Sequence, residues 1–137
     1  MASTYNKINL FVADLANKAH NLGSDQLAVA LTDTAPTTGQ AGESFAGEIS
    51  YANISGVNPN YITTTSSTQT SGTYKLILAQ LTMTATGNVP QFRYVGIKNT
   101  TASKVICWFD YGSEINMISG DQFIVQFDNT NGLLQIA

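Results

Sequence analysis

The clearest sign of the fold class is the segment YKLILAQLTMTAT at residues 74–86. Large side chains recur at every second position, first at Tyr74, Leu76 and Leu78 and then at Leu81, Met83 and Ala85. This period is typical of a β-strand with one buried face. Because the register changes between the two runs, we expect a β-bulge near Gln80.

Two further segments predict strands inside a sheet. Residues 26–33 place Leu27, Val29 and Leu31 on one face and small residues on the other. Residues 104–111 are apolar on both faces, which predicts the most central strand.

Shorter alternating segments bring the expected number of strands to about eight. Residues 61–62 and 92–97 are two of them, and residues 122–128 and 133–137 are the last two, so the chain is expected to end inside a strand. The last two flank Asn129-Thr130-Asn131-Gly132, whose Asn-Gly pair predicts a hairpin turn.

The N-terminal region leaves two interpretations open. Residues 6–12 are expected to form a strand with Ile8 and Leu10 on one face. Residues 13–22 fit a short helix, because their apolar side chains recur at helical spacing. They fit equally an extended strand that bends back through residues 22–25.

A long polar excursion occupies about residues 34–73. Its first part has few apolar anchors, namely Phe45, Ile49, Tyr51, Ile54 and Val57. Residues 63–73 contain no apolar side chain at all, so we expect a solvated loop or an edge strand there. Long excursions on small domains are often functional.

Together these patterns predict one all-β domain over residues 1–137: a single antiparallel β-sandwich, jelly-roll-like, with about eight strands and a possible short helix at residues 13–22. The chain lacks the Cys-Trp-Cys framework of an immunoglobulin domain, because Cys107 is its single cysteine. No repeat of 20 to 50 residues occurs in the sequence.

The composition argues against several partners. Only 11% of residues are charged, the net charge is −3, and Thr, Asn and Ser replace the missing charges. The six Lys and Arg are scattered, which argues against nucleic-acid binding. No apolar run exceeds five residues and no secretory signal precedes residue 8, so we expect no membrane partner and synthesis in a cytoplasm.

The sequence offers weak support for catalysis or metal binding. His20 is the single histidine and no nucleophile elbow accompanies it, while Cys107 lies in an apolar run that predicts an inert thiol. One Cys and one His cannot form a structural zinc site. We therefore expect no catalytic residue, no metal site and no cofactor.

The acidic residues favour no specific chemistry either. Asp128 to Gly132 lacks the ligand spacing of a calcium loop, and a hairpin turn explains it. The pairs Asp110 with Glu114 and Asp121 with Asp128 are compatible with glycoside hydrolysis, but acids in turns usually serve solubility.

Aromatic side chains in the loops, such as Phe45, Tyr51 and Tyr61, suggest a binding role. An equally simple interpretation is that such rings fasten the loop to its own core. The sequence does not distinguish these two roles.

Several motifs resemble those of small virion proteins of tailed bacteriophages. The chain opens with YNKINLFVADLA at residues 5–16 and HNL at residues 20–22, followed by QLAVALTDTAP at residues 26–36. The later matches are SGTYKL at residues 71–76, WFDYGS at residues 108–113 and the terminal segment from Phe127 to Ala137. The resemblance covers most of the chain.

The resemblance implies a capsid decoration, or cement, protein of β-sandwich fold. Such a protein binds the expanded shell, bridges neighbouring copies of the major capsid protein and forms a dimer or trimer with itself. It is made in the bacterial cytoplasm and resides on the capsid surface of the virion. We expect capsid contacts from residues 34–73 and 2–6, with Phe45, Tyr51, Tyr61 and Tyr5 as the contact side chains.

Two other functions stay open at this point. The first is a tail- or fibre-associated β-sandwich module that binds host-surface glycan, because such folds also carry lectin sites. The second is a small enzyme with a polar pocket that the sequence does not reveal.

Overall fold

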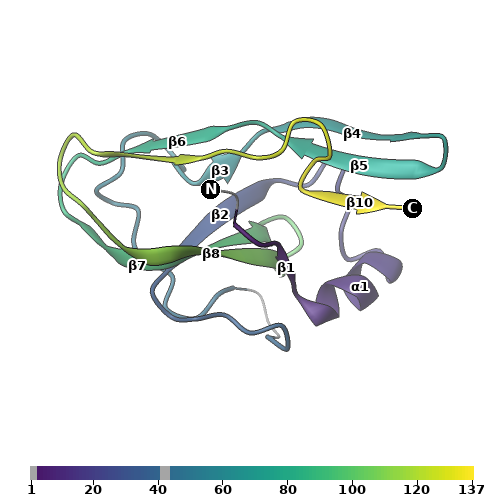
Figure 1. Ribbon diagram of the computed structural model, residues 1–137, viewed down its shortest axis with the longest axis horizontal. Helices are drawn as coiled ribbons and strands as arrows, with labels where there is room; N and C mark the ends of the chain where they lie inside the picture. The colour runs from purple at the N-terminus through teal and green to yellow at the C-terminus, as the bar shows by residue number, and fades with distance from the viewer. Residues whose placement is uncertain (1–2, 41–43) are drawn as a thin grey trace.

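The computed structural model describes residues 3–40 and 44–137, which form one short helix and ten strands (Figure 1). The helix α1 spans Asn9–Ala16. The strands are β1 (Asn6–Lys7), β2 (Leu27–Thr32), β3 (Tyr61–Ile62), β4 (Thr64–Thr70), β5 (Thr73–Leu78), β6 (Leu81–Thr84), β7 (Val89–Asn99), β8 (Lys104–Met117), β9 (Gln122–Val125) and β10 (Leu134–Ile136).

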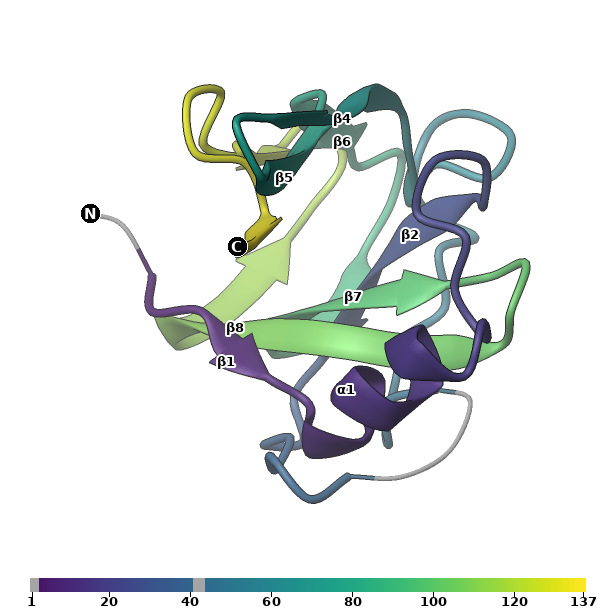
Figure 2. The same cartoon turned by 90° about the vertical axis from the view of Figure 1, so that its right-hand side faces the viewer.

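All strand pairs are antiparallel and form three sheets. The largest has the order β1-β8-β7-β2-β3, and two smaller sheets have the orders β10-β5-β4 and β6-β9. The smaller sheets lie over one face of the large sheet in both views, and none of the three closes into a barrel (Figures 1 and 2). The predicted antiparallel, mostly β architecture is confirmed, with ten strands in place of about eight.

The strand β2 lies inside the large sheet, as its alternation of large and small residues predicted. It pairs with β7 on one side and β3 on the other, and all six of its residues are buried. Ala30 lies opposite Gly96 of β7, so small residues face each other across this pair. That face of the sheet leaves room for side chains from another segment.

The N-terminal prediction was wrong in its boundaries. Strand β1 stops at Lys7, and the helix begins at Asn9, four residues before the predicted start. Ile8 and Phe11 are buried while Leu10 is 39% exposed, so the apolar residues follow a helical period rather than alternation. Lys18 adopts a left-handed φ of 64°, which ends the helical path well before residue 22.

The predicted strand over residues 74–86 is two strands. Its halves β5 and β6 are separated by Ala79 and Gln80, where a bulge was expected. The break is more than a bulge, because β5 pairs with β4 and β10 whereas β6 pairs with β9.

The predicted hairpin at Asn129–Gly132 was also wrong. The turn exists: the Asp128 carboxylate accepts hydrogen bonds from the backbone amides of Thr130 and Asn131, both at 2.8 Å. The flanking strands do not pair with each other, since β9 pairs with β6 and β10 with β5. Gly132 has a φ of 78° and lies so close to Leu76 that a side chain at position 132 would collide with the Leu76 backbone. The turn therefore connects β9 of one small sheet to β10 of the other.

The prediction that residues 104–111 form the most central strand was wrong, because β7 lies in the middle of the large sheet and β8 lies beside the edge strand β1. Strand β8 also extends beyond the predicted residue 111 and contains a large bulge. Tyr94 of β7 pairs with Asp110 and Phe92 pairs with Ile115, so Arg93 alone lies opposite the four residues 111–114. All four are exposed. A bulge of this size pushes the chain out of the sheet.

No helix within the described ranges is long and apolar enough to cross a membrane.

Candidate functional site

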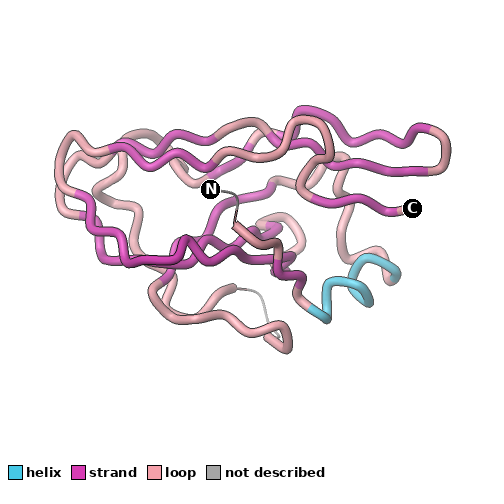
Figure 3. The backbone as a smooth tube through the Cα atoms, in the orientation of Figure 1, coloured by secondary structure: helices cyan, strands magenta, loops and turns pink. Residues whose placement is uncertain are grey.

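The excursion between β2 and β3 is fastened to the large sheet by Phe45. Its described residues form no strand and are drawn as loop in Figure 3, although Glu48 makes an isolated bridge to Thr32 and Ile54 makes one to Ala85. The Phe45 ring is 2% exposed and occupies the space where a side chain at Gly96 would lie. Phe45 therefore packs within the chain, and its expected contact with a capsid stays a prediction.

Polar contacts add a second set of attachments. The Tyr51 hydroxyl accepts a hydrogen bond from the Leu31 amide at 2.9 Å and lies 2.7 Å from the Glu48 carboxylate. Glu48 also pairs with Lys98 of β7 at 2.8 Å, with both side chains less than 20% exposed. Burial raises the pKa of Tyr51, so its hydroxyl keeps its proton and donates to Glu48.

The other two predicted contact residues lie at opposite edges of the large sheet. Tyr61 is on the edge strand β3 and is 40% exposed. Tyr5 precedes β1 at the other edge and packs edge-on against Phe109 at 5.9 Å between ring centroids. Four strand spacings of about 4.8 Å separate these edges, so the predicted residues do not form one site. Ala2 and residues 41–43 of the predicted contact segments lie outside the described residues.

The edge strand β4 is the most open part of the predicted contact segment. It lies at the end of the β10-β5-β4 sheet, and Thr65, Thr68, Gln69 and Thr70 are exposed. Its sequence TTSSTQT contains no charge and no proline. Proteins usually protect exposed sheet edges with charged residues or proline. Because β4 has neither, it is available for pairing with another strand.

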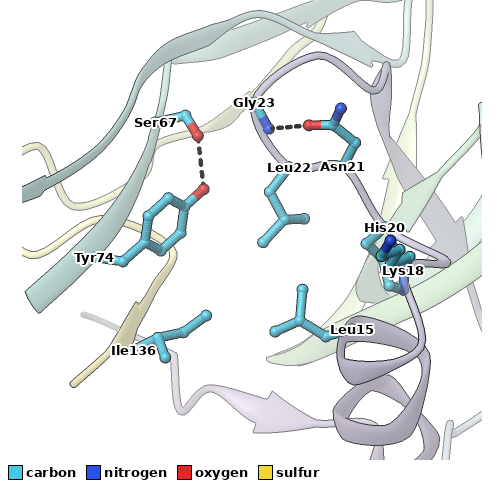
Figure 4. Close-up of a pocket in the computed structure, with 9 residues that line it drawn as sticks. All are labelled: Leu15, Lys18, His20, Asn21, Leu22, Gly23, Ser67, Tyr74 and Ile136. Carbon is cyan, nitrogen blue, oxygen red and sulfur yellow. Dashed lines mark hydrogen bonds between the residues drawn. The ribbon is translucent and has the colours of Figure 1, made fainter.

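A groove separates α1 and β1 from the smaller sheets. It consists of two adjoining hollows of about 580 and 540 Å³, which share Leu15 of α1 and Ile136 of β10. In Figure 4, Leu15, Leu22 and Ile136 point into the first hollow from three different segments. Ser67 and Tyr74, whose hydroxyl oxygens are 2.7 Å apart in a hydrogen bond, line the opposite side of this hollow.

The groove was not predicted from the sequence. Lys7 and Lys18 line it, together with apolar residues of α1 and β10 that are far apart along the chain. The one available signal for the groove was the number of apolar residues in the helical segment. Phe11, Val12 and Leu15 are more apolar residues than a short helix needs to pack one face against the core.

His20 forms a buried polar cluster beside the groove. Its Nδ1 lies 3.0 Å from the Asn99 side-chain amide, which also donates to the Asp25 carboxylate at 2.6 Å. Because an amide nitrogen donates, Nδ1 accepts and the ring carries its proton on Nε2. Burial lowers the pKa of His20, although Asp14 and Asp25 act in the opposite direction. These contacts explain His20 as a structural residue.

The remaining candidates for chemistry have structural partners. Cys107 is fully buried, and burial raises the pKa of its thiol. Arg93 binds the Asp110 carboxylate through two hydrogen bonds and lowers its pKa. Asp121 accepts a hydrogen bond from the Ile118 amide at 3.0 Å. Among residues 3–40 and 44–137 no group of three His, Cys, Asp or Glu could hold a metal ion.

No protein-family model, curated protein or solved structure matches this chain.

Proposed function

We propose that this chain is a non-enzymatic structural protein of a bacteriophage virion, a capsid decoration protein with a jelly-roll-like sandwich fold. It binds the outer surface of the expanded shell and clamps neighbouring copies of the major capsid protein. The motifs at residues 5–16, 26–36 and 108–113 support this proposal through their resemblance to such proteins.

The structural observation behind the proposal is the open edge of β4. Seven residues without charge or proline present unpaired backbone groups along one side of a sheet. A strand from a capsid subunit adds to such an edge through main-chain hydrogen bonds. The exposed ring of Tyr61 lies close in sequence, on β3, and supplies apolar contact area.

The rest of the fold keeps this edge in a defined position. The buried Phe45 ring and the Glu48–Lys98 pair hold the preceding excursion against the large sheet. A contact presented by a rigid element loses little conformational entropy on binding. When one copy contacts two capsid subunits, the second contact forms at a high effective concentration. The two subunits are then held together by several linked contacts rather than by a single strong one.

Cosedimentation tests the proposal. The purified protein is incubated with expanded, undecorated capsids of its own phage, and the bound amount is read from the pelleted bands. Saturation at a near-stoichiometric ratio to the major capsid protein is the expected result. Absence from the pellet at micromolar concentrations contradicts the proposal, and binding to isolated tails instead would favour the tail-module alternative.

Charged substitutions at the edge test the role of β4. Thr65→Lys with Thr70→Lys places a cation near each end of this exposed strand, and lysine on an edge disfavours strand addition. We expect capsid binding to fall by about tenfold or more, a change of roughly 1.4 kcal/mol. The matched control is Thr82→Lys with Thr86→Lys, which changes one exposed threonine of β6 and one exposed threonine just after it. An equal loss in the control would show that added charge, and not the edge, reduces binding.

A further inference from the structure

The two ends of the large sheet differ in their surface chemistry. Strand β7 runs eleven residues from Val89, which pairs with Met117, to Asn99, which contacts His20 beside the groove. At about 3.3 Å per residue the two ends lie roughly 35 Å apart. One end carries the groove, and the other carries the bulge at residues 111–114 and the turn at residues 118–121, which we call the acidic end.

The groove combines an apolar floor with unpaired positive charge. Lys18 lines one hollow and Lys7 the other, and no carboxylate lines either of them. Neither lysine forms a salt bridge with any residue that the structure describes. Ile136, which both hollows share, is 43% exposed.

The acidic end has the opposite character. Glu114 is exposed on the bulge and Asp121 on the turn, and neither forms a salt bridge within the described ranges. The nearby cation Arg93 is already bound to Asp110. Two large apolar side chains project beside these carboxylates, since Tyr111 is 52% and Ile118 is 62% exposed.

We propose that the groove of one copy binds the acidic end of a second copy. Tyr111 and Ile118 enter the apolar hollows, and Glu114 and Asp121 face Lys7 and Lys18. The groove and the acidic end are therefore complementary in both charge and apolar character, which is the combination that gives protein contacts their specificity.

This contact has a defined symmetry. Because the two surfaces are different patches of the chain, the interface is head-to-tail and repeats from copy to copy, giving a closed ring or a chain of copies. An interface between identical patches is disfavoured, since two grooves would bring four lysines together. The inference concerns the self-association that the sequence resemblance implies, and it does not depend on capsid binding.

Charge reversal with rescue tests the interface in the purified protein alone. The groove variant is Lys7→Glu with Lys18→Glu. The acidic-end variant is Glu114→Lys with Ser119→Lys, because Ser119 is exposed on the same turn as Asp121, whose own carboxylate accepts a hydrogen bond from the Ile118 amide. A third variant carries all four changes, and the control is Thr82→Glu with Thr86→Glu on exposed positions outside both surfaces. Sedimentation equilibrium at about 50 mM salt, where exposed charges are weakly screened, measures association, and circular dichroism verifies that each variant is folded.

The expected results differ for each variant. The unmodified protein and the control associate, each single-end variant loses at least roughly tenfold in association constant, and the four-change variant recovers most of it. Three results would overturn the inference: a monomeric unmodified protein at concentrations on the order of 100 μM, loss from only one of the two ends, or no recovery with all four changes. Capsid binding is measured separately, so failure of that assay leaves this interface unaffected.

Discussion

The excursion at residues 34–60 and the strand β4 have similar polar sequences but different environments. The excursion has a few apolar anchors, and two of them, Phe45 and Ile54, are buried. Strand β4 has none, and its residues lie on an open edge. A few large side chains therefore determine whether a polar segment packs against the sheet or stays available to a partner.

Removing the main anchor is the strongest test of this comparison. Phe45→Ala takes away a ring that is 2% exposed and leaves a cavity over Gly96. We expect a loss of about 3–4 kcal/mol in the free energy of unfolding, as for other buried aromatic residues. Urea unfolding measures it, with Val57→Ala as the control, because Val57 lies in the same excursion but is 92% exposed. Similar losses in both variants would refute the role of Phe45 as an anchor.

The polar attachment at Tyr51 should contribute less. Tyr51→Phe keeps the ring but removes the hydroxyl that accepts from the Leu31 amide and donates to Glu48. The expected loss is about 1–2 kcal/mol, because the Leu31 amide is left without its partner in a half-buried site while Glu48 keeps its hydrogen bonds to Lys98. Tyr61→Phe is the matched change on an exposed ring, and we expect no measurable effect from it. If both variants unfold at the same urea concentration, the hydroxyl does not fasten the excursion.

The connection between α1 and β2 extends the comparison to a segment fastened by His20. Burial lowers the pKa of His20 below its ordinary value of 6.5. The unfolded chain therefore binds a proton at a higher pH than the folded chain, and stability falls as the pH drops below about 6.5. Protonation of Nδ1 also turns this atom into a hydrogen-bond donor that faces the Asn99 amide donor, so the hydrogen bond between them is lost.

Unfolding experiments between pH 7.5 and 5.5 measure this dependence. His20 is the single histidine of the chain, so His20→Gln should flatten the slope of stability against pH in this range. The glutamine oxygen still accepts from Asn99, which separates titration from loss of the hydrogen bond. An unchanged slope in His20→Gln would show that another group is responsible.

The sequence was most informative for β2, a strand that pairs with other strands on both of its sides. Alternating large and small residues in β2 predicted both its strand and its place inside the sheet, because that pattern has few alternatives. It was less informative where the partner decides the outcome. Nothing in YKLILAQLTMTAT shows that β5 and β6 pair with different strands, and Asn131-Gly132 specifies a turn without specifying what the flanking strands pair with.

The candidate surfaces were predictable to different degrees for the same reason. The edge strand β4 was foreseen as one of two options because a segment without apolar side chains cannot be buried. The groove was not foreseen, because Lys7, Leu15 and Ile136 meet only after three separate elements pack. Local patterns thus identify exposed segments but not concave surfaces.

The smallest effect on stability is expected at β4. Thr65→Lys with Thr70→Lys changes two exposed side chains without altering the pairing of β4 with β5, so the free energy of unfolding should change by no more than about 0.5 kcal/mol. Urea unfolding checks this value on the variants used in the capsid assay. A large loss would mean that the outer side of β4 supports the fold as the excursion does, and the contrast between the two segments would disappear. A small change together with lost capsid binding would show that the edge is kept open for a partner rather than for the stability of the chain.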